Sequence, residues 1–447
     1  QTCALPILRE EKFMDKMADV LGRAGAWCGQ NKYLSAIKNA FQNFMPLTIA
    51  GAIGVLWCNV LVNDQTGLGL FFKPIMALDF LNPAFQAVNF CTISCITVGI
   101  TLGIAQEIGV WNMGAERAGY IPGLVGLAAW LSVTNTSHMV EGAKEAFTGI
   151  AGNELGATGL FTGMIIGVLS VELFCFFEKQ DALKIKMPEQ VPPGVARAFE
   201  VLVPATITLI ITACIGSACY NLTGLYLNDV IKNGIQGPLG AVGATIPGVM
   251  IIYLVIMLFW LVGIHGNNML SAVKEALFTP LALENVEKFN KGEKPTNIIN
   301  MYALQMWGEF GGSGVTIGLV IAIMIFGKRE DNKAIATLSL VPGLFNINET
   351  VTFGIPMVLN PILGIPFVVA PLITIIIGYV LTVIGFCPVA CLTVPWTTPP
   401  IVFGFLACGA NVMGAVTQAI LIVVSTVIYT PFLISYEKYQ NKQAAEA

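Results

Sequence analysis

Polar residues interrupt an apolar stretch of this sequence at Asn346, Asn348 and Glu349, and Pro and Gly residues flank them on both sides. An ionisable group at membrane depth costs roughly 2.5–3.5 kcal/mol on insertion scales, so such groups tend to line a cavity and carry a function. A carboxylate can accept a hydrogen bond from a sugar hydroxyl and, as a general base, take its proton when a phosphoryl group arrives. The alternative is that Glu349 begins a helix at a water interface, but apolar sequence continues on either side.

A second group with chemical potential is His265, which ends an apolar segment in the run Gly-Ile-His-Gly-Asn-Asn. A histidine can donate or accept a hydrogen bond and titrates near neutral pH. Asn268 presents a donor and an acceptor together, which suits the paired hydroxyls of a sugar. Gly266 brings the backbone close to the histidine. A lone histidine at a helix end can also be an ordinary interface residue, and that interpretation stays open.

A third candidate is Trp396, which lies in the run Pro-Trp-Thr-Thr-Pro-Pro. Irregular backbone would leave its ring free to stack on the apolar face of a pyranose, although an interfacial tryptophan belt is the alternative. The Gly-rich run at 308–318 contains Glu309, and we interpret it as a hinge or a close helix contact. The sequence has no GxxxxGK[ST] motif, so a nucleotide site is unsupported and energy must come from an ion gradient or a partner.

The composition shows which kind of protein must position these residues. Of 447 residues, 55% are hydrophobic and 11% are charged, against roughly 25% charged in a soluble domain. The mean hydropathy is +0.75. The 11 Cys form no CxxC motif and there are two His, so we expect neither a metal site, nor a disulfide framework, nor a cofactor. The chain is therefore predicted to be an all-α polytopic membrane protein.

The apolar segments predict about ten transmembrane helices plus two re-entrant hairpins. Lys and Arg counts place the N-terminus and the polar loop at 178–199 in the cytoplasm, as the positive-inside rule requires. Residues 225–245 read as an interfacial helix. Basic clusters near 288 and 328 conflict with a single crossing between them, so we expect the hairpins at 266–300 and 340–356. The spans are predicted near 41–62, 88–106, 119–133, 158–177, 200–220, 246–264, 310–327, 355–386 and 398–434.

The segments suggest two halves. Residues 12–199 are expected to form a scaffold and dimerisation half, and residues 200–436 a substrate-binding transport half that carries nearly all the intramembrane polar groups. A cytoplasmic tail follows at 437–447. Residues 1–11 lack a starting Met and are expected to be artefactual or disordered, and Met14 is a plausible start.

Five stretches together resemble the membrane component (IIC) of the lactose/cellobiose/chitobiose family of the bacterial sugar phosphotransferase system. They are Phe-Met-Pro-Leu-Thr-Ile-Ala-Gly at 44–51, the Met-Pro and Val-Pro-Pro loop at 185–197, Gly-Ile-His-Gly at 263–266, Asn-Ile-Asn-Glu at 346–349, and Pro-Trp-Thr-Thr-Pro-Pro at 395–400. The loop at 185–197 is the most specific, because nothing general about membrane proteins requires it.

This resemblance implies a homodimer in the bacterial cell membrane whose C-terminal half encloses a disaccharide. It places His265 and Glu349 near the C6 hydroxyl of the sugar and Trp396 against a sugar ring. The phosphoryl group would come from a cysteine on a separate IIB protein, with IIA upstream, and transport would involve an elevator-like shift of the substrate half. Thr350 departs from the family, which usually has Pro after the glutamate, and this leaves the sugar preference open.

Two hypotheses follow. The first is a sugar permease that imports a β-linked disaccharide and acts as the membrane subunit of a sugar phosphotransferase, with Glu349 and His265 as reacting groups. Asn346, Asn348, Asn268, Gly266 and Trp396 would bind the sugar. The second is an ion-coupled secondary transporter that uses Glu349 as its coupling site. Neither hypothesis involves nucleic acid.

Overall fold

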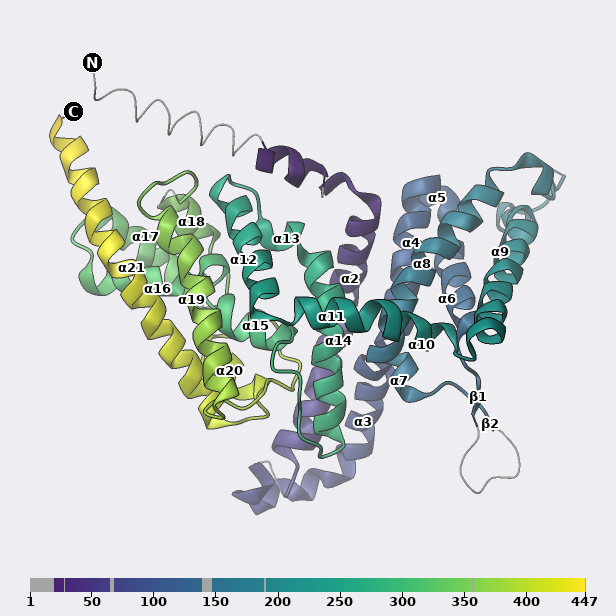
Figure 1. The fold of residues 1–447 in the computed structure, drawn as a ribbon, viewed down its shortest axis with the longest axis horizontal. Coiled ribbons are helices and arrows are strands. Elements are labelled where there is room, and N and C mark those ends of the chain that lie inside the picture. Colours follow the sequence, from purple (N-terminus) through teal and green to yellow (C-terminus); the bar gives the residue numbers. More distant parts are fainter. Residues whose placement is uncertain are drawn as a thin grey trace.

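A computed structural model describes residues 20–27, 29–64, 68–138, 147–188, 190–355 and 357–446. Residues 1–11, expected to be artefactual or disordered, lie outside these ranges. Helices dominate the described chain (Figure 1). Its strands are β1 (Ser137–His138) and β2 (Phe147–Thr148), an antiparallel pair in which Ser137 faces Thr148.

Five long helices form a first bundle. Three of these helices pack against α4 (Ile96–Met113), whose Ile100, Ile104 and Ile108 recur every four residues on one face and are fully buried, and the fifth, α9 (Pro193–Thr223), packs against two of those three. Short helices α3 (Asn82–Cys91), α5 (Ala115–Ala118) and α7 (Gly152–Leu155) lie between them. The long helices are α2 (Lys32–Leu56), α4 (Ile96–Met113), α6 (Ile121–Val133), α8 (Ala157–Glu178) and α9 (Pro193–Thr223).

A second bundle follows the short helices α10 (Leu227–Ile231) and α11 (Gly237–Gly243), which lie crosswise between the two bundles (Figure 1). Its core contains the fully buried rings of Trp260, Trp307 and Phe367. Its main helices are α12 (Ile246–Leu261), α14 (Ser271–Asn290), α15 (Met301–Gly308), α16 (Ile317–Phe326), α19 (Gly364–Val383), α20 (Val402–Ala407) and α21 (Val412–Glu446).

The helices agree with the expected all-α membrane fold. Among the described residues, six helices are long and apolar enough to span a membrane, and α6 and α12 are shorter apolar helices. The segments Met301–Val315 and Ile317–Phe326 are together long and apolar enough to span, but they meet at an angle of 60° and form either a broken span or a re-entrant loop. The helix α14 adds a less apolar segment of 20 residues.

The two segments expected to form hairpins differ in their helices. Around residues 340–356, α17 (Glu330–Leu344) and α18 (Glu349–Gly354) pack against each other on either side of a turn. Around 266–300, by contrast, the four-residue helix α13 (Gly266–Met269) precedes one continuous helix, α14. The hairpin was expected because the basic clusters near 288 and 328 conflict with a single crossing between them. On α14 itself, Lys274 is only 5% exposed and pairs with Glu309 inside the bundle.

This arrangement also separates the two basic clusters. The side-chain amide of Asn59, beyond the C-terminal end of α2, donates to Asn290 at the C-terminal end of α14 (3.1 Å). The lysines near 288 therefore lie at the end of the bundles where α2 and α14 finish. The backbone N–H groups of Lys328 and Arg329 donate to Glu437 near the end of α21, at the opposite end (Figure 1). The bent pair α15–α16 lies between the two clusters in the sequence.

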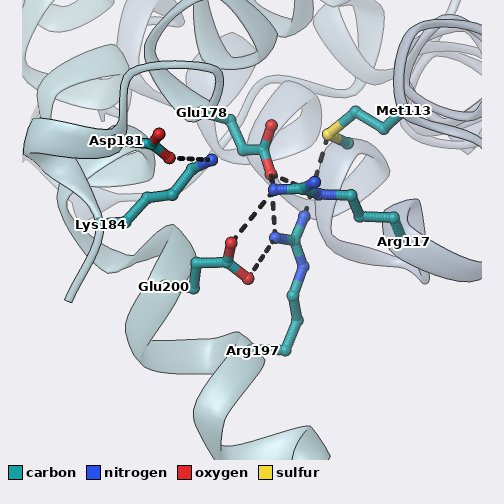
Figure 2. A network of polar contacts seen from close by, with 7 residues as sticks. All are labelled: Met113, Arg117, Glu178, Asp181, Lys184, Arg197 and Glu200. Carbon is teal, nitrogen blue, oxygen red and sulfur yellow. Dashed lines mark hydrogen bonds and ion pairs between the residues drawn. The ribbon is translucent and has the colours of Figure 1, made fainter. Parts of the chain in front are cut away.

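A charged network holds the first bundle together at the end that carries α5. Figure 2 shows Arg117 of α5 and Arg197 of α9 reaching the same carboxylate, Glu178 at the end of α8. Glu178 is buried, and both arginines also pair with Glu200 of α9. The network therefore joins the two ends of the polar loop at 178–199 to the turn between α4 and α6.

Candidate functional site

A cavity of about 210 Å³ lies in the second bundle where several breaks in helices meet. The turns between α12 and α13, between α15 and α16, and between α17 and α18 all contribute, together with the irregular segment before α20. Non-helical backbone is tolerated at membrane depth where it lines such a cavity. The lining residues are His265, Asn267, Asn268, Gln305, Glu309, Phe310, Gly312, Ser313, Asn346, Ile347, Asn348, Glu349, Trp396, Phe403 and Gln418.

His265 and Glu349 face each other in this cavity although 84 residues separate them in the sequence. The Nδ1 atom of His265 accepts the backbone N–H of Asn268 (3.2 Å), so the neutral ring carries its hydrogen on Nε2. That Nε2 lies 4.0 Å from Oε1 of Glu349. The buried ring of Trp260 lies 4.4 Å from the imidazole, centroid to centroid, and limits its movement. The cavity thus presents a carboxylate acceptor next to an imidazole N–H donor.

The two amides before Glu349 make their contacts with other segments. Asn346 adopts a positive φ of 62° at the turn. Its side chain accepts the N–H of Gly311 (2.6 Å) and donates to the carbonyls of Trp396 and Thr398. Asn348 is 4% exposed and donates to the carbonyl of Ser313 (2.7 Å). These contacts join three segments of the cavity wall and hold Glu349 in place.

The other predicted site residues lie close by, with one difference. Asn268 is exposed and lines the cavity, as does Trp396, which is 44% exposed. Gly266 is buried and is not among the lining residues. A Cβ at this position would collide with the carbonyl oxygen of Ile256, so glycine is needed there to let the start of α13 approach α12.

The structure adds Glu309, which the sequence led us to place in a hinge. Gly311, Gly312 and Gly314 have positive φ angles, as a break between α15 and α16 requires, but the carboxylate of Glu309 lines the cavity. Its Oε1 accepts the hydroxyl of Tyr253 (2.7 Å) and pairs with Lys274. Two donors on one oxygen leave the second oxygen available for a ligand.

Three further amides were not among the predicted site residues. Asn267 lies in the Asn-Asn pair after His265, which could have pointed to it, whereas isolated Gln residues such as Gln305 and Gln418 give no sequence signal. Asn267 donates to Ser313 (3.0 Å), while its buried carbonyl oxygen has no hydrogen-bond partner. The buried carbonyl oxygen of Gln305 has none either. Unpaired buried acceptors are costly, and both could receive a hydroxyl from a bound ligand. Gln418 instead uses its amide to anchor the segment before α20.

The cavity therefore combines acidic acceptors, amides and an exposed indole ring. These are the groups that a polyhydroxylated ring compound would engage, through its hydroxyls at the edge and its C–H face against the indole. Within the described ranges, no group of three or more His, Cys, Asp or Glu residues is arranged to hold a metal ion.

Comparison with known proteins finds similar chains. The family model described as "Phosphotransferase system, EIIC" matches residues 38–371. The oligo-beta-mannoside-specific EIIC component of Bacillus subtilis is 32% identical, with 96% of this chain and 94% of the relative covered. The cellobiose-specific EIIC component of Lactococcus lactis is 30% identical, with 96% and 98% covered.

A solved structure is similar over nearly the whole chain. It is the transporter ChbC, the IIC component from the N,N'-diacetylchitobiose-specific phosphotransferase system. The TM-score is 0.85 at 29% sequence identity, with 94% of this chain and 97% of the other covered.

Proposed function

The chain belongs to the phosphotransferase system EIIC family, and from this membership we propose how its cavity carries out sugar import. It is a multi-pass membrane permease for β-linked disaccharides that works with IIB and IIA partners. The observation that carries the proposal is the approach of His265 to Glu349 across the cavity, at 4.0 Å between Nε2 and Oε1.

Glu349 accepts the hydrogen bond of the sugar hydroxyl that becomes phosphorylated. When the phosphorylated cysteine of the IIB partner arrives, the hydroxyl oxygen attacks phosphorus, the P–S bond breaks and the carboxylate takes the hydroxyl proton. The Nε2–H of His265 points at the same place and donates to the hydroxyl oxygen or to the incoming phosphoryl oxygens. Glu349 is half exposed, which leaves room for the sugar between the two groups.

The remaining cavity groups bind the sugar. Trp396 offers an exposed ring for stacking, and Asn268 offers an exposed amide. The unpaired carbonyl oxygens of Asn267 and Gln305 receive hydroxyl donors. Asn346 and Asn348 contribute mainly by holding the turn that carries Glu349. Gly266 contributes through the backbone position of its neighbour His265.

The two bundles supply the fixed and moving parts. The helix α9 packs chiefly against α6 and α8, so we place the division between the scaffold and the transport half in the crosswise helices α10 and α11 rather than at residue 199. Exposed apolar residues on α9, such as Leu202, Ile210 and Ile215, are available to lipid or to a second copy in a homodimer. The end with Arg117, Arg329 and the N-terminal part of α2 faces the cytoplasm, because basic residues concentrate there.

The test is sugar phosphorylation by the purified protein with its phosphorylated IIB partner. Glu349→Gln should bind the disaccharide but transfer no phosphoryl group, because an amide cannot take the proton. Glu349→Asp, which keeps the carboxylate, should retain part of the rate. Full activity in Glu349→Gln would remove the proposed role. Uptake into vesicles driven by a proton or sodium gradient, without any phosphorylated partner, would favour the ion-coupled alternative instead.

A further inference from the structure

An apolar groove runs along the outer surface of the second bundle, where α16 packs against α21 at one edge of the molecule (Figure 1). Ile325 and Phe326 of α16 and Val423 and Val427 of α21 line it, and all four side chains are exposed. The polar side-chain atoms among its lining residues are two threonine hydroxyls of α21, and both donate to carbonyl oxygens one turn earlier in the same helix. The groove therefore fits a hydrocarbon chain rather than a sugar.

Basic side chains lie where this groove ends. Lys328 follows Phe326 by two residues, and Lys438 lies one helical turn beyond Ile434, another lining residue. Both lysines are exposed. The backbone N–H of Lys328 donates to the carboxylate of Glu437 (2.8 Å), and this hydrogen bond joins the end of α16 to α21 directly beside Lys438. The two ammonium groups therefore lie near the same end of the groove.

The acidic residues around this end have partners of their own. The two at the start of α17 each pair with a basic neighbour. The carboxylate of Glu437 is buried and accepts the backbone N–H groups of Lys328 and Arg329. In the part of the chain that the structure describes, neither Lys328 nor Lys438 takes part in an ion pair through its side chain. The apolar groove thus leads to two positive charges that are available to an anion.

We propose that this groove binds an anionic phospholipid. One acyl chain lies between α16 and α21, and the headgroup phosphate accepts hydrogen bonds from Lys328 and Lys438. Lysine side chains suit this position, because their aliphatic stems lie along apolar surface while the charge stays at the level of the headgroups. Each lysine near a membrane surface favours anionic over neutral lipid. A free phosphate ion would use the charged end alone, whereas a phospholipid uses the apolar wall as well.

The test measures lipid binding to the purified, delipidated full-length protein by native mass spectrometry. The probes are phosphatidylglycerol, which is anionic, and phosphatidylcholine with the same acyl chains, which is zwitterionic. The wild type should bind phosphatidylglycerol at least about fivefold more tightly. Lys328→Gln combined with Lys438→Gln should remove this preference and leave binding of phosphatidylcholine unchanged. Lys179→Gln combined with Lys186→Gln is the matched control, because both of these lysines are exposed but lie beside the first bundle, and it should keep the preference.

The apolar wall is tested separately by Val427→Trp, which fills the groove and should remove the bound lipid of either kind from the mass spectrum. Val412→Trp is its control, because Val412 is also 65% exposed on α21 but does not line the groove. Val423→Trp fills the same groove and serves if Val427→Trp does not fold.

Four results would overturn the proposal. The wild type could bind the two lipids equally, or the double lysine variant could keep the preference for phosphatidylglycerol. Filling the groove could leave both lipids bound. Excess inorganic phosphate could displace phosphatidylglycerol, which would mean that the lysines bind phosphate without help from the apolar wall. Retention of the lipid in excess phosphate is the result we expect.

Discussion

Glu178 offers a sharp test of how the first bundle is held together. Its side chain is 3% exposed, and Oε1 receives Arg117 at 2.8 Å and Arg197 at 2.9 Å (Figure 2). Glu178→Gln removes the charge from this position and leaves two guanidinium groups facing an amide. Breaking a buried ion pair costs about 3–5 kcal/mol. Both arginines keep Glu200 as a partner, and Arg117 is 47% exposed. We therefore expect the free energy of unfolding to fall by about 3 kcal/mol, at the lower end of this range.

The assay is unfolding of the purified protein in mixed micelles by titration with a denaturing detergent. Asp181→Asn is the matched control, because it neutralises a carboxylate at the same end of the bundle whose side chain is 81% exposed and pairs with Lys184. That control should unfold like the wild type. The side chain of Glu200 is 29% exposed, so Glu200→Gln should lose less stability than Glu178→Gln and more than Asp181→Asn. The reasoning is refuted if Glu178→Gln loses no more stability than Asp181→Asn.

Three further predictions concern the transport half. Gly266→Ala should slow sugar phosphorylation in a single-turnover assay, because its methyl group collides with the carbonyl of Ile256 and displaces His265; an unchanged rate would contradict this. Thr350→Pro should leave stability within about 1 kcal/mol and sugar Kd unchanged, since residue 350 lies in the first turn of α18, where proline is tolerated. The hydrogen bond from Arg329 holds the pKa of Asp331 in the folded protein below its usual value. The ionised Asp331 therefore stabilises the fold at any pH above its pKa in the unfolded chain, and this stabilisation is lost as the pH falls through its pKa in the folded protein. At neutral pH the free energy of unfolding of Asp331→Asn should therefore be lower than that of the wild type by up to about 1 kcal/mol. In acid the two proteins should unfold at the same detergent concentration, and a difference that persists there would refute this role of the Asp331 charge.

Much of the fold could be predicted because the membrane restricts the choices. Apolar segments of spanning length predict helices, because in lipid only a helix or a closed β-barrel satisfies all of its backbone hydrogen bonds. The segment 266–300 was harder to predict. We expected a hairpin there from the basic clusters near 288 and 328, and the chain forms α13 and the continuous helix α14. Lys274 and Glu309 compensate each other inside the bundle, and a pairing between residues 35 positions apart is not visible in the sequence.

The site was predicted unevenly for a related reason. Residues in unusual runs, such as His265, Glu349 and Trp396, stand out because polar groups and prolines interrupt apolar sequence. Gln305 and Glu309 do not stand out, and only the packing of α15 against its neighbours brings them to the cavity. Asn346 was expected to bind the sugar through its side chain. In the structure its amide makes hydrogen bonds that join three segments of the cavity wall.

The sequence by itself determined that this chain is a helical membrane protein with a carboxylate, an imidazole and an indole on broken segments, because composition and local pattern suffice for that. Only the tertiary structure decided that Glu349 and His265 face each other and that Glu309 and Gln305 join them. The physical reason is that these relations depend on which helix breaks meet in space. Backbone breaks at 265, 312 and 347 are local events, but their meeting point is set by helix packing across the whole second bundle.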